Sequence, residues 1–391
     1  MPFLPKSPFA PPCRVGVVGT GFVASVFVRL LLRTAPDLPV TAVLSRRPSA
    51  QIAPHLQPFY YATQALDDFL AACDLVVECS GDICHATTVI EAALRLGKPV
   101  VTMHCEWHVT VGSFFAGKGL LSEAEGDQPG SLAVLREEIL AMGFEPRVYG
   151  NIKHFLNHQP TPAEMLFWSE RQGIRLRQTT SFTDGTKVQF EQALVANGLN
   201  ADILKPGLRG LVTQNLQVGA AELAEEAQTA QLGTVSDYLL APNLPPGVFI
   251  TASHDPADQA ALAYLKMGPG PWYTLYRPYH LCQYEMVRTV RRMAQGGPAL
   301  LNNSVAPRIG IRAIAKRDLA PGELIDNAIG SFVLRGEAIR LAEYPDHLPM
   351  GLIQAARVQR PIEAGDYLRW GDLELPDSRA LQVAKQLYLP T

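Results

Sequence analysis

The chain has 391 residues, of which 47% are hydrophobic and 18% are charged, and these values exclude a disordered chain and predict two or three domains. Lys+Arg 34 against Asp+Glu 37 leaves a formal net charge of -3, which excludes the large cationic field that nucleic acid or an anionic membrane would require. The 6 cysteines include no CxxC pair and indicate a reducing compartment. The N-terminal residues contain no long apolar run that would indicate a signal peptide, so we expect a cytoplasmic protein.

The first 150 residues alternate strands with helices. Residues 1–12 are rich in proline and are expected to form a loose arm. Apolar runs after this arm predict buried strands at 14–18, 40–44, 75–79 and 99–102. Helical spacing of apolar residues predicts the intervening helices at 22–33, 67–72 and 85–96. Strands and helices that alternate in this way predict an α/β fold with a doubly wound parallel sheet of the Rossmann type over 13–150.

The pattern changes near residue 150, and 151–300 are predicted to form an α+β catalytic domain with a return helix, 284–294, near its end. Residues 175–182 and 186–190 are interpreted as two extended segments, because the intervening Asp184-Gly185 is a hairpin turn signal. Residues 191–196 are compatible with a helix. From 305 to 391, short apolar runs separated by turns predict a small, mostly β domain.

The first chemical motif lies where the first predicted strand meets the first predicted helix. It has the form Gly-x-Gly-x-x-Ala and ends at Ala24. In a dinucleotide-binding fold the first glycine makes the tight turn, the second lets the backbone approach the pyrophosphate, and the small third residue allows close packing of helix and strand. The helix then offers its N-terminal N–H groups to the phosphates. The alternative is a structural glycine turn in an α/β domain without a nucleotide. We expect cofactor contacts from Gly19, Thr20, Gly21, Phe22 and Val23.

The end of the second predicted strand indicates which dinucleotide is bound. NAD-specific sites have an acid here that binds the ribose 2′-OH, whereas this chain has Ser45, Arg46 and Arg47. A serine and two arginines suit a 2′-phosphate, so NADP is predicted in preference to NAD. The alternative is that both arginines are ordinary solvated loop charges.

Two further strand ends are expected near the cofactor. The loop after strand 75–79 lies over the dinucleotide in such sheets, so Ser80 and Gly81 are predicted cofactor contacts. Residues 103–108 end the next strand and are expected to line the nicotinamide site. They contain histidine, cysteine and glutamate but match no known zinc spacing, so no metal site is predicted there.

Segments along nearly the whole chain resemble one known family, the homoserine-dehydrogenase-like NAD(P) oxidoreductases with a C-terminal SAF domain, a β-clip module. The best-known member type of this family is the 1-deoxy-D-xylulose 5-phosphate reductoisomerase-like enzyme. The resemblance implies an NAD(P)-dependent oxidoreductase with a β-clip domain at 305–391, and it does not fix the substrate. The similar segments are 15–21, 78–81, 126–129, 182–187, 246–249, 276–281 and 315–323.

Hydride transfer to a carbonyl requires an acid or a cation that stabilises the developing alkoxide. Lys153 directly follows the predicted nucleotide-binding domain, and a lysine does this work in homoserine dehydrogenases, so Lys153 is the first catalytic candidate. Asp184 and Lys187 share the predicted hairpin turn and are further candidates, Lys187 for an anionic group and Asp184 for a hydroxyl or a metal. Glu191 adds a carboxylate for substrate binding. The alternatives are a surface lysine and an aspartate that only forms the turn.

Three more candidates fall within four residues, beside Pro278. Arg277 is expected to clamp a carboxylate or phosphate of the substrate, and Tyr279 to bind the substrate beside it. His280 is expected to act as an acid or base near neutral pH. The alternative is a loop that seals two domains together, with the tyrosine and histidine as satisfied core groups.

The sequence therefore predicts an NADP-dependent oxidoreductase acting on the carbonyl or alcohol of a small polar metabolite. Two substrate classes stay open, a phosphosugar such as 1-deoxy-D-xylulose 5-phosphate for a reductoisomerase and a homoserine-type substrate for a dehydrogenase. Only the reductoisomerase needs a divalent cation, for which Asp184 and Glu191 are candidate ligands. The alternatives are a nucleotide-binding regulatory or scaffold protein without catalysis and a lyase or isomerase without net redox change. We expect a homo-oligomer, by base rate a dimer, and neither nucleic acid nor membrane as a partner.

Overall fold

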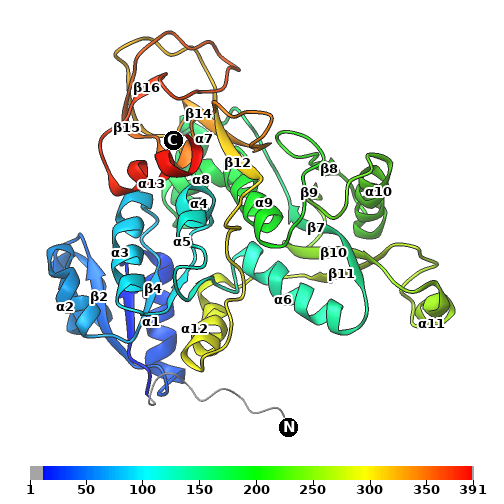
Figure 1. Cartoon of the computed structure of the whole chain (residues 1–391), viewed down its shortest axis with the longest axis horizontal. Helices are drawn as coiled ribbons and strands as arrows, with labels where there is room; N and C mark the ends of the chain where they lie inside the picture. The colour runs from blue at the N-terminus through cyan, green and yellow to red at the C-terminus, as the bar shows by residue number, and fades with distance from the viewer. Residues whose placement is uncertain (1–11, 390–391) are drawn as a thin grey trace. The chain divides into compact units, whose positions relative to one another are not determined.

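The computed structural model describes residues 12–389, which divide into two compact units (Figure 1). The first unit contains the residues up to Ser131 together with His280–Val305, and the second contains Leu132–Tyr279 and the residues from Ala306 onward. The predicted arm at 1–12 lies outside the described residues except for Pro12. The domain boundaries predicted near 150 and 300 remain predictions.

The first unit is built around a parallel sheet of 6 strands in the order β3-β2-β1-β4-β5-β6. Every residue of β1, β4 and β5 is buried, as expected for parallel strands covered on both faces. The strand order reverses between β1 and β4, which is the switch point at which such sheets bind ligands. The predicted Rossmann sheet is confirmed, although β3 and β6 were not among the predicted strands. The strands are β1 (Val15–Val18), β2 (Val40–Ser45), β3 (Tyr60–Ala62), β4 (Leu75–Glu78), β5 (Val100–Thr102) and β6 (Leu121–Glu123).

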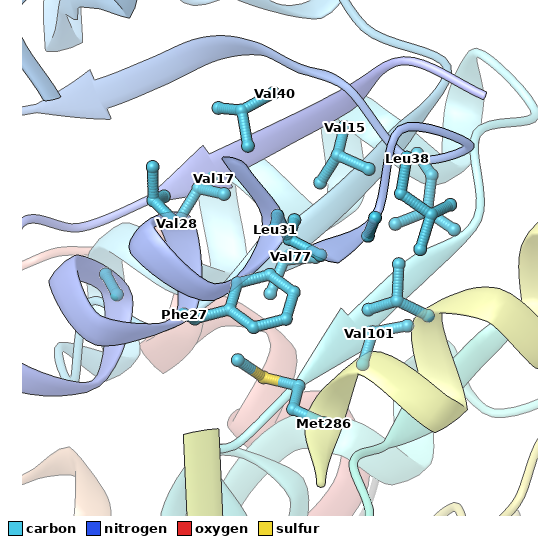
Figure 2. Close-up of a cluster of buried hydrophobic side chains, with 14 of the residues drawn as sticks. Val15, Val17, Phe27, Val28, Leu31, Leu38, Val40, Val77, Val101 and Met286 are labelled. Atoms are coloured by element: carbon cyan, nitrogen blue, oxygen red, sulfur yellow. The ribbon is translucent and has the colours of Figure 1, made fainter. Parts of the chain in front are cut away.

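Apolar side chains of two helices far apart in the sequence share one core with this sheet. Figure 2 shows Phe27 and Leu31 of the first helix beside Val17 of β1, with Met286 of the return helix reaching the same cluster. Burial of each such side chain contributes roughly 1.5–3 kcal/mol, which fixes the return segment to the first unit. The helices predicted in this unit are confirmed with small shifts of their ends. They are α1 (Phe22–Thr34), α2 (Leu66–Ala71), α3 (Ile83–Arg95) and α12 (Met286–Ala294), and the short α4 (Cys105–Trp107) and α5 (Ser113–Phe115) were not predicted.

The second unit contains a mixed sheet of 5 strands in the order β11-β10-β7-β9-β8. Its central strand β7 pairs in parallel with β9 and antiparallel with β10. Helix α10 packs on the sheet through a core that includes Val148, Leu223 and Phe249. The strands are β7 (Glu145–Lys153), β8 (Leu211–Val212), β9 (Val235–Leu240), β10 (Gly247–Ser253) and β11 (Tyr273–Arg277). The helices are α6 (Gln128–Ala141), which continues from the first unit, α7 (Pro162–Gln172), α8 (Leu176–Thr183), α9 (Thr186–Gly198), α10 (Leu216–Thr229) and α11 (Gln259–Tyr264).

The hairpin predicted over 175–190 is wrong, because these residues belong to helices α8 and α9. Asp184-Gly185 is the junction between the two helices. Gly185 has a φ of 86°, and Asp184 Oδ1 accepts a hydrogen bond of 2.9 Å from the backbone N–H of Thr186. Helix α9 is buried along nearly its whole length. The Asp-Gly pair on which the prediction rested therefore joins two helices instead of two strands, and the buried position of α9 overrides the strand propensity of its β-branched residues.

The residues from 306 onward are mostly β, as predicted. Strands β12 and β14 form an antiparallel pair, and β13, β15 and β16 form a second small sheet. The assignment of this part to a β-clip remains a prediction. Its elements are β12 (Ile309–Ala315), β13 (Leu324–Asn327), β14 (Leu334–Arg340), β15 (Gln354–Val358), β16 (Leu373–Glu374) and α13 (Arg379–Tyr388). Within 12–389, no helix is both long enough and apolar enough to cross a bilayer.

Asp237 of β9 makes the stability of the second unit depend on pH. Its carboxylate is fully buried and accepts hydrogen bonds from the backbone N–H groups of Arg209, Gly210 and Tyr238, but burial raises its pKa to about 6. Because this pKa lies above the ordinary aspartate value of 3.8, the folded state holds the proton more tightly than the unfolded state does. The stabilisation is complete below about pH 4 and is lost as the pH rises through 6.

Between pH 5 and pH 7 the wild type is therefore expected to lose about 1 kcal/mol of unfolding free energy relative to Asp237→Asn, which has no such titration. Urea unfolding of both proteins at the two pH values measures this difference. An equal change in unfolding free energy between pH 5 and pH 7 in both proteins would show that Asp237 does not titrate in this range.

Candidate functional site

The turn between β1 and α1 has the geometry of a phosphate-binding turn. Gly19 has a φ of 105°, and a Cβ at this position would lie 2.8 Å from the carbonyl oxygen of Cys79, so a side chain is excluded. Helix α1 begins after Gly21 with no side-chain cap and no acidic residue in its first turn. The positive end of the helix dipole therefore faces the carboxyl edge of the sheet at its switch point, and the first turn of the helix contains no acidic side chain that would compensate it.

The end of β2 places polar groups beside this turn. Thr20 Oγ1 lies 3.3 Å from Ser45 Oγ, which also accepts a hydrogen bond of 3.0 Å from the backbone N–H of Arg47. Arg46 forms an ion pair of 2.6 Å with Asp82, yet 56% of its side chain is exposed. Asp82 also caps α3, and sequence reasoning missed it, although an aspartate before a predicted helix is a capping signal. The predicted 2′-phosphate residues thus meet at one strand end, with Arg46 accessible and held by a carboxylate.

The carboxyl edge of the same sheet carries a row of polar residues. Glu78, Thr102 and Glu123 end strands β4, β5 and β6 and are paired in register, so their side chains lie on one face of the sheet. Both glutamates are completely buried. Neither was predicted as a site residue, and the sequence signal for them was an acid at the end of an otherwise apolar strand.

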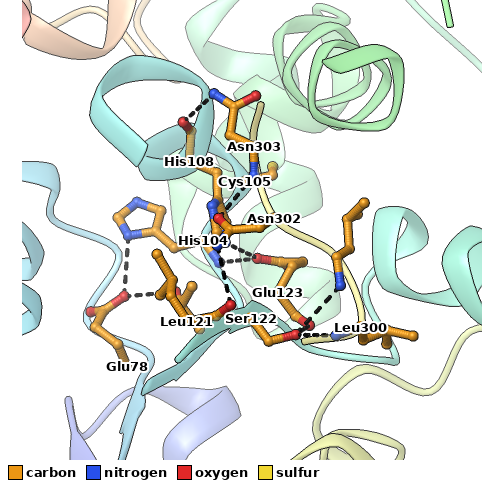
Figure 3. A network of polar contacts seen from close by, with 12 residues as sticks. Glu78, His104, Cys105, His108, Leu121, Ser122, Glu123, Leu300, Asn302 and Asn303 are labelled. Carbon is orange, nitrogen blue, oxygen red and sulfur yellow. Dashed lines mark hydrogen bonds and ion pairs between the residues drawn. The ribbon is translucent and has the colours of Figure 1, made fainter. Parts of the chain in front are cut away.

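Each buried glutamate faces a histidine from the segment that follows β5 (Figure 3). His104 Nδ1 lies 3.3 Å from Glu78 Oε2, and His108 Nε2 lies 3.3 Å from Glu123 Oε2. Burial lowers the pKa of His108 to about 3, so this imidazole is neutral. Burial raises the pKa of Glu78, but the hydrogen bond and the charge of His104, together with the hydrogen bonds from Ser80, outweigh this effect and bring it below its usual value. Glu78 is therefore a buried, ionised carboxylate.

A structural or catalytic zinc ion is bound by three or more side chains that converge on one point. In the described part of the chain, no group of three or more His, Cys, Asp and Glu side chains is arranged to hold a metal ion.

His280 lies beside the turn at 126–129 in the first unit. Its Nε2 lies 3.4 Å from Gln128 Nε2, and its Nδ1 lies 3.7 Å from Cys282 Sγ. The backbone N–H of Cys282 donates to the carbonyl of Gly126 over 3.1 Å, and a Cβ on Gly126 would lie 2.2 Å from the Cys282 carbonyl oxygen. The turn at 126–129 and the segment that begins at His280, both of which include residues singled out from the sequence, are therefore packed together.

Arg277 and Tyr279, predicted together with His280, belong to the second unit. The guanidinium carbon of Arg277 lies 5.4 Å from the centre of the Tyr279 ring, a cation–π distance. The boundary between the two units therefore falls within the predicted group of three residues, between Tyr279 and His280.

A second polar group in the second unit is centred on Glu191 of α9. Lys153 Nζ donates to Glu191 Oε2 over 3.0 Å, and Asn151 Nδ2 donates to the same oxygen over 2.9 Å. Lys187 lies one helical turn before Glu191 and shares its face of α9. Glu191 is buried, whereas Lys153 keeps 20% of its side chain exposed. The structure thus brings together three predicted residues and adds Asn151, which shares a face of β7 with Lys153.

Asp184, the remaining predicted catalytic residue, is held in a buried ion pair. Its Oδ2 lies 2.6 Å from Lys316 Nζ, and both side chains are essentially inaccessible. Lys316 also donates to the carbonyl of Ser331. A substrate or metal contact at Asp184 would require breaking this pair. Sequence reasoning missed Lys316 because no local signal connects residues so far apart in the chain.

Comparison with known proteins gives two family matches. Residues 19–106 match the NAD-binding domain of homoserine dehydrogenase, and residues 126–286 match the catalytic domain of the oxidoreductase DRL. The first match begins at the glycine of the β1–α1 turn. The second begins at the turn that packs against His280 and ends just beyond that histidine. A search of curated proteins gives no match.

Solved structures that match include a probable dehydrogenase from Thermotoga maritima, with 11% identity, a TM-score of 0.42, and coverage of 73% of this chain and 90% of that chain. A putative myo-inositol dehydrogenase from Sinorhizobium meliloti has 12% identity, a TM-score of 0.40, and coverage of 73% and 91%. UDP-N-acetylglucosamine 3-dehydrogenase from Acidithiobacillus ferrooxidans has 12% identity, a TM-score of 0.42, and coverage of 74% and 91%. Similarity at this level carries no conclusion about activity.

Proposed function

We propose that this chain, an NAD(P)-dependent oxidoreductase by its two family matches, uses NADP(H) to reduce a carbonyl group, or to oxidise the matching alcohol, of a small polar metabolite. The observation that carries the proposal is the amino end of α1, which has no side-chain cap and follows a turn in which Gly19 has no room for a side chain. A turn of this kind at the switch point of a parallel sheet is suited to a pyrophosphate.

The preference for NADP over NAD rests on the end of β2. Ser45 and the exposed Arg46 lie where an acid would bind the ribose 2′-OH of NAD, and a guanidinium with a hydroxyl suits a 2′-phosphate. Gly81, in the loop after β4, has open space around its missing side chain and leaves room for a ligand beside the backbone. The cofactor supplies or accepts the hydride, and the chain binds and orients the reactants around it.

For the chemical step we propose Lys153 as the cation that stabilises the developing alkoxide. Its ammonium group is bound by Glu191, which fixes its position at the end of β7 while part of the side chain stays accessible. Lys187 and Arg277 are proposed to bind an anionic group of the substrate, with Tyr279 beside the arginine. His280 is proposed as an acid or base.

Among the two substrate classes, the residues favour a homoserine-type or other simple dehydrogenase over a reductoisomerase. Isomerisation before hydride transfer needs a divalent cation that holds vicinal oxygens. Asp184, one of its two candidate ligands, is bound to Lys316, and Glu191, the other, is bound to Lys153 and Asn151. The donor groups that such a cation would need are therefore engaged within the chain.

The proposal is tested by calorimetric titration of the wild type and of Arg46→Ala with NADPH and with NADH. We expect Arg46→Ala to weaken NADPH binding about tenfold, because it removes the phosphate ligand and leaves Asp82 without its partner beside the 2′-phosphate. NADH, which lacks that phosphate, should bind both proteins equally.

The control variant is Arg33→Ala, which removes an exposed arginine from the opposite end of α1 and should bind both nucleotides as the wild type does. Equal weakening of NADPH and NADH by Arg46→Ala would refute the assignment of the 2′-phosphate site. Failure of the wild type to bind either nucleotide would refute the proposed function as a whole.

A further inference from the structure

The buried carboxylate of Glu78 lies next to the proposed cofactor turn. Glu78 is paired in register with Val18, the residue before Gly19, and it precedes Cys79, whose carbonyl oxygen occupies the space that a side chain on Gly19 would need. The carboxylate accepts hydrogen bonds from the backbone N–H of Ser80 over 2.7 Å and from the Thr102 hydroxyl over 3.2 Å. Its remaining contact is the His104 imidazole at 3.3 Å.

These contacts suit a carboxylate and do not suit a carboxylic acid. The Ser80 N–H and the Thr102 hydroxyl both donate, and an ionised carboxylate is an acceptor only, so every contact of this kind stabilises the charge. Glu78 is completely buried, which removes the solvent that would screen this charge from a ligand at the strand end. The strand end therefore holds a buried carboxylate that solvent does not screen and that is opposed within the chain by the His104 imidazole at 3.3 Å.

The position of the charge in the sheet indicates which part of the cofactor experiences it. In a doubly wound sheet the two halves bind the two mononucleotides, and the 2′-phosphate site lies at β2. The half formed by β4, β5 and β6 is then left for the nicotinamide mononucleotide. Glu78 ends β4, the strand of that half nearest the pyrophosphate turn.

The two redox states of the cofactor differ in charge at this end. When the reduced ring gives up a hydride, with its two electrons, to a carbonyl carbon, the ring becomes positively charged and a proton completes the alcohol. A nearby fixed carboxylate therefore stabilises the oxidised ring and leaves the neutral reduced ring almost unaffected. At an effective dielectric constant of about 20, two unit charges about 10 Å apart attract one another by an amount that corresponds to roughly tenfold in affinity.

We propose that Glu78 sets the redox preference of the bound cofactor, making the chain bind the oxidised nicotinamide dinucleotide more tightly, relative to the reduced form, than it would without this carboxylate. The inference rests on the proposed function, since it requires a dinucleotide in this unit. It makes bound NADPH a stronger hydride donor than free NADPH, because the bound product of hydride loss is stabilised.

The test compares the dissociation constants of NADP⁺ and NADPH for the wild type and for Glu78→Gln, both measured by calorimetry. The glutamine keeps an oxygen for the Ser80 N–H and removes the charge. We expect the ratio of the NADP⁺ constant to the NADPH constant to rise about tenfold in the variant. A merely structural role would weaken both forms together and leave this ratio unchanged.

Two more variants complete the experiment. His104→Lys places a permanent cation against the carboxylate and is expected to raise the same ratio of dissociation constants. This variant tests the proposal if Glu78→Gln does not fold. Asp74→Asn removes a carboxylate that precedes β4 at its opposite end, where it pairs with Arg14, and should leave the ratio unchanged.

If the wild type binds both cofactor forms while Glu78→Gln and His104→Lys keep its ratio within about twofold, the proposal for Glu78 is overturned and the proposed function stands. If the wild type binds neither form, the proposed function itself fails.

Discussion

Lys316→Met is expected to lower the free energy of unfolding by about 3–5 kcal/mol at neutral pH. The substitution removes the ammonium group that lies 2.6 Å from Asp184 Oδ2 and leaves a carboxylate in a site where both side chains are at most 2% exposed. Burial already raises the pKa of Asp184 with the lysine present. Without it the carboxyl group must take up a proton or stay uncompensated, and both outcomes favour the unfolded chain. Urea unfolding monitored by circular dichroism measures the change.

Two further variants show whether the ion pair itself is responsible. Arg317→Met removes the partner of Glu323 at the neighbouring position, where half of the arginine side chain is exposed, and should lower stability by less than about 1 kcal/mol. In Asp184→Asn/Lys316→Met the uncompensated charge is gone, so much of the lost stability should return. A loss below about 1 kcal/mol for Lys316→Met would show that the pair contributes little to the fold.

Lys153→Met is expected to lower kcat by roughly 10²–10³-fold on any carbonyl compound that the wild type reduces with NADPH. The lysine ammonium is bound by Glu191 over 3.0 Å, so its position is fixed before substrate binds, and methionine removes the charge while it keeps the length of the side chain. Continuous steady-state assays that follow the loss of NADPH absorbance measure kcat and KM separately.

Lys153→Arg serves as the matched variant for this prediction, because it keeps a cation beside Glu191 and should recover part of the lost kcat. The affinity for NADPH should be the same in all three proteins, because Lys153 is not among the proposed phosphate contacts. An unchanged kcat in Lys153→Met would assign this lysine a structural role in holding Glu191.

The nucleotide-binding part could be predicted well because its signals are local. The Gly19 turn, the uncapped start of α1, and the serine and arginine at the end of β2 each depend on a few consecutive residues, and the structure places them at one edge of the sheet. The alternation of apolar strands and amphipathic helices likewise fixed the fold class, because buried parallel strands have few other sequence patterns.

The polar pairs could not be predicted because they join residues that the chain brings together only after folding. Glu78 meets His104 through the register of β4 and β5, and Asp184 meets Lys316 from a different part of the second unit. The first residues of α9, 186–190, were mistaken for a strand, whereas the helix expected at 191–196 is part of α9. The burial of this helix depends on neighbours that local propensity does not include. Lys153, Lys187 and Glu191 were all predicted from the sequence, but the hydrogen bond that joins Lys153 to Glu191 is known only from the structure.

The central claim is that the β1–α1 turn binds the pyrophosphate of a dinucleotide, and titration of NADPH into the wild type and Gly19→Ala tests it most directly. An alanine Cβ would lie 2.8 Å from the Cys79 carbonyl oxygen at a φ of 105°, so we predict that the wild type binds NADPH and that the variant binds it at least about tenfold more weakly. Gly97→Ala, at a φ of 69° with open space around it, should bind as the wild type does. Equal binding by the wild type and Gly19→Ala would contradict the account.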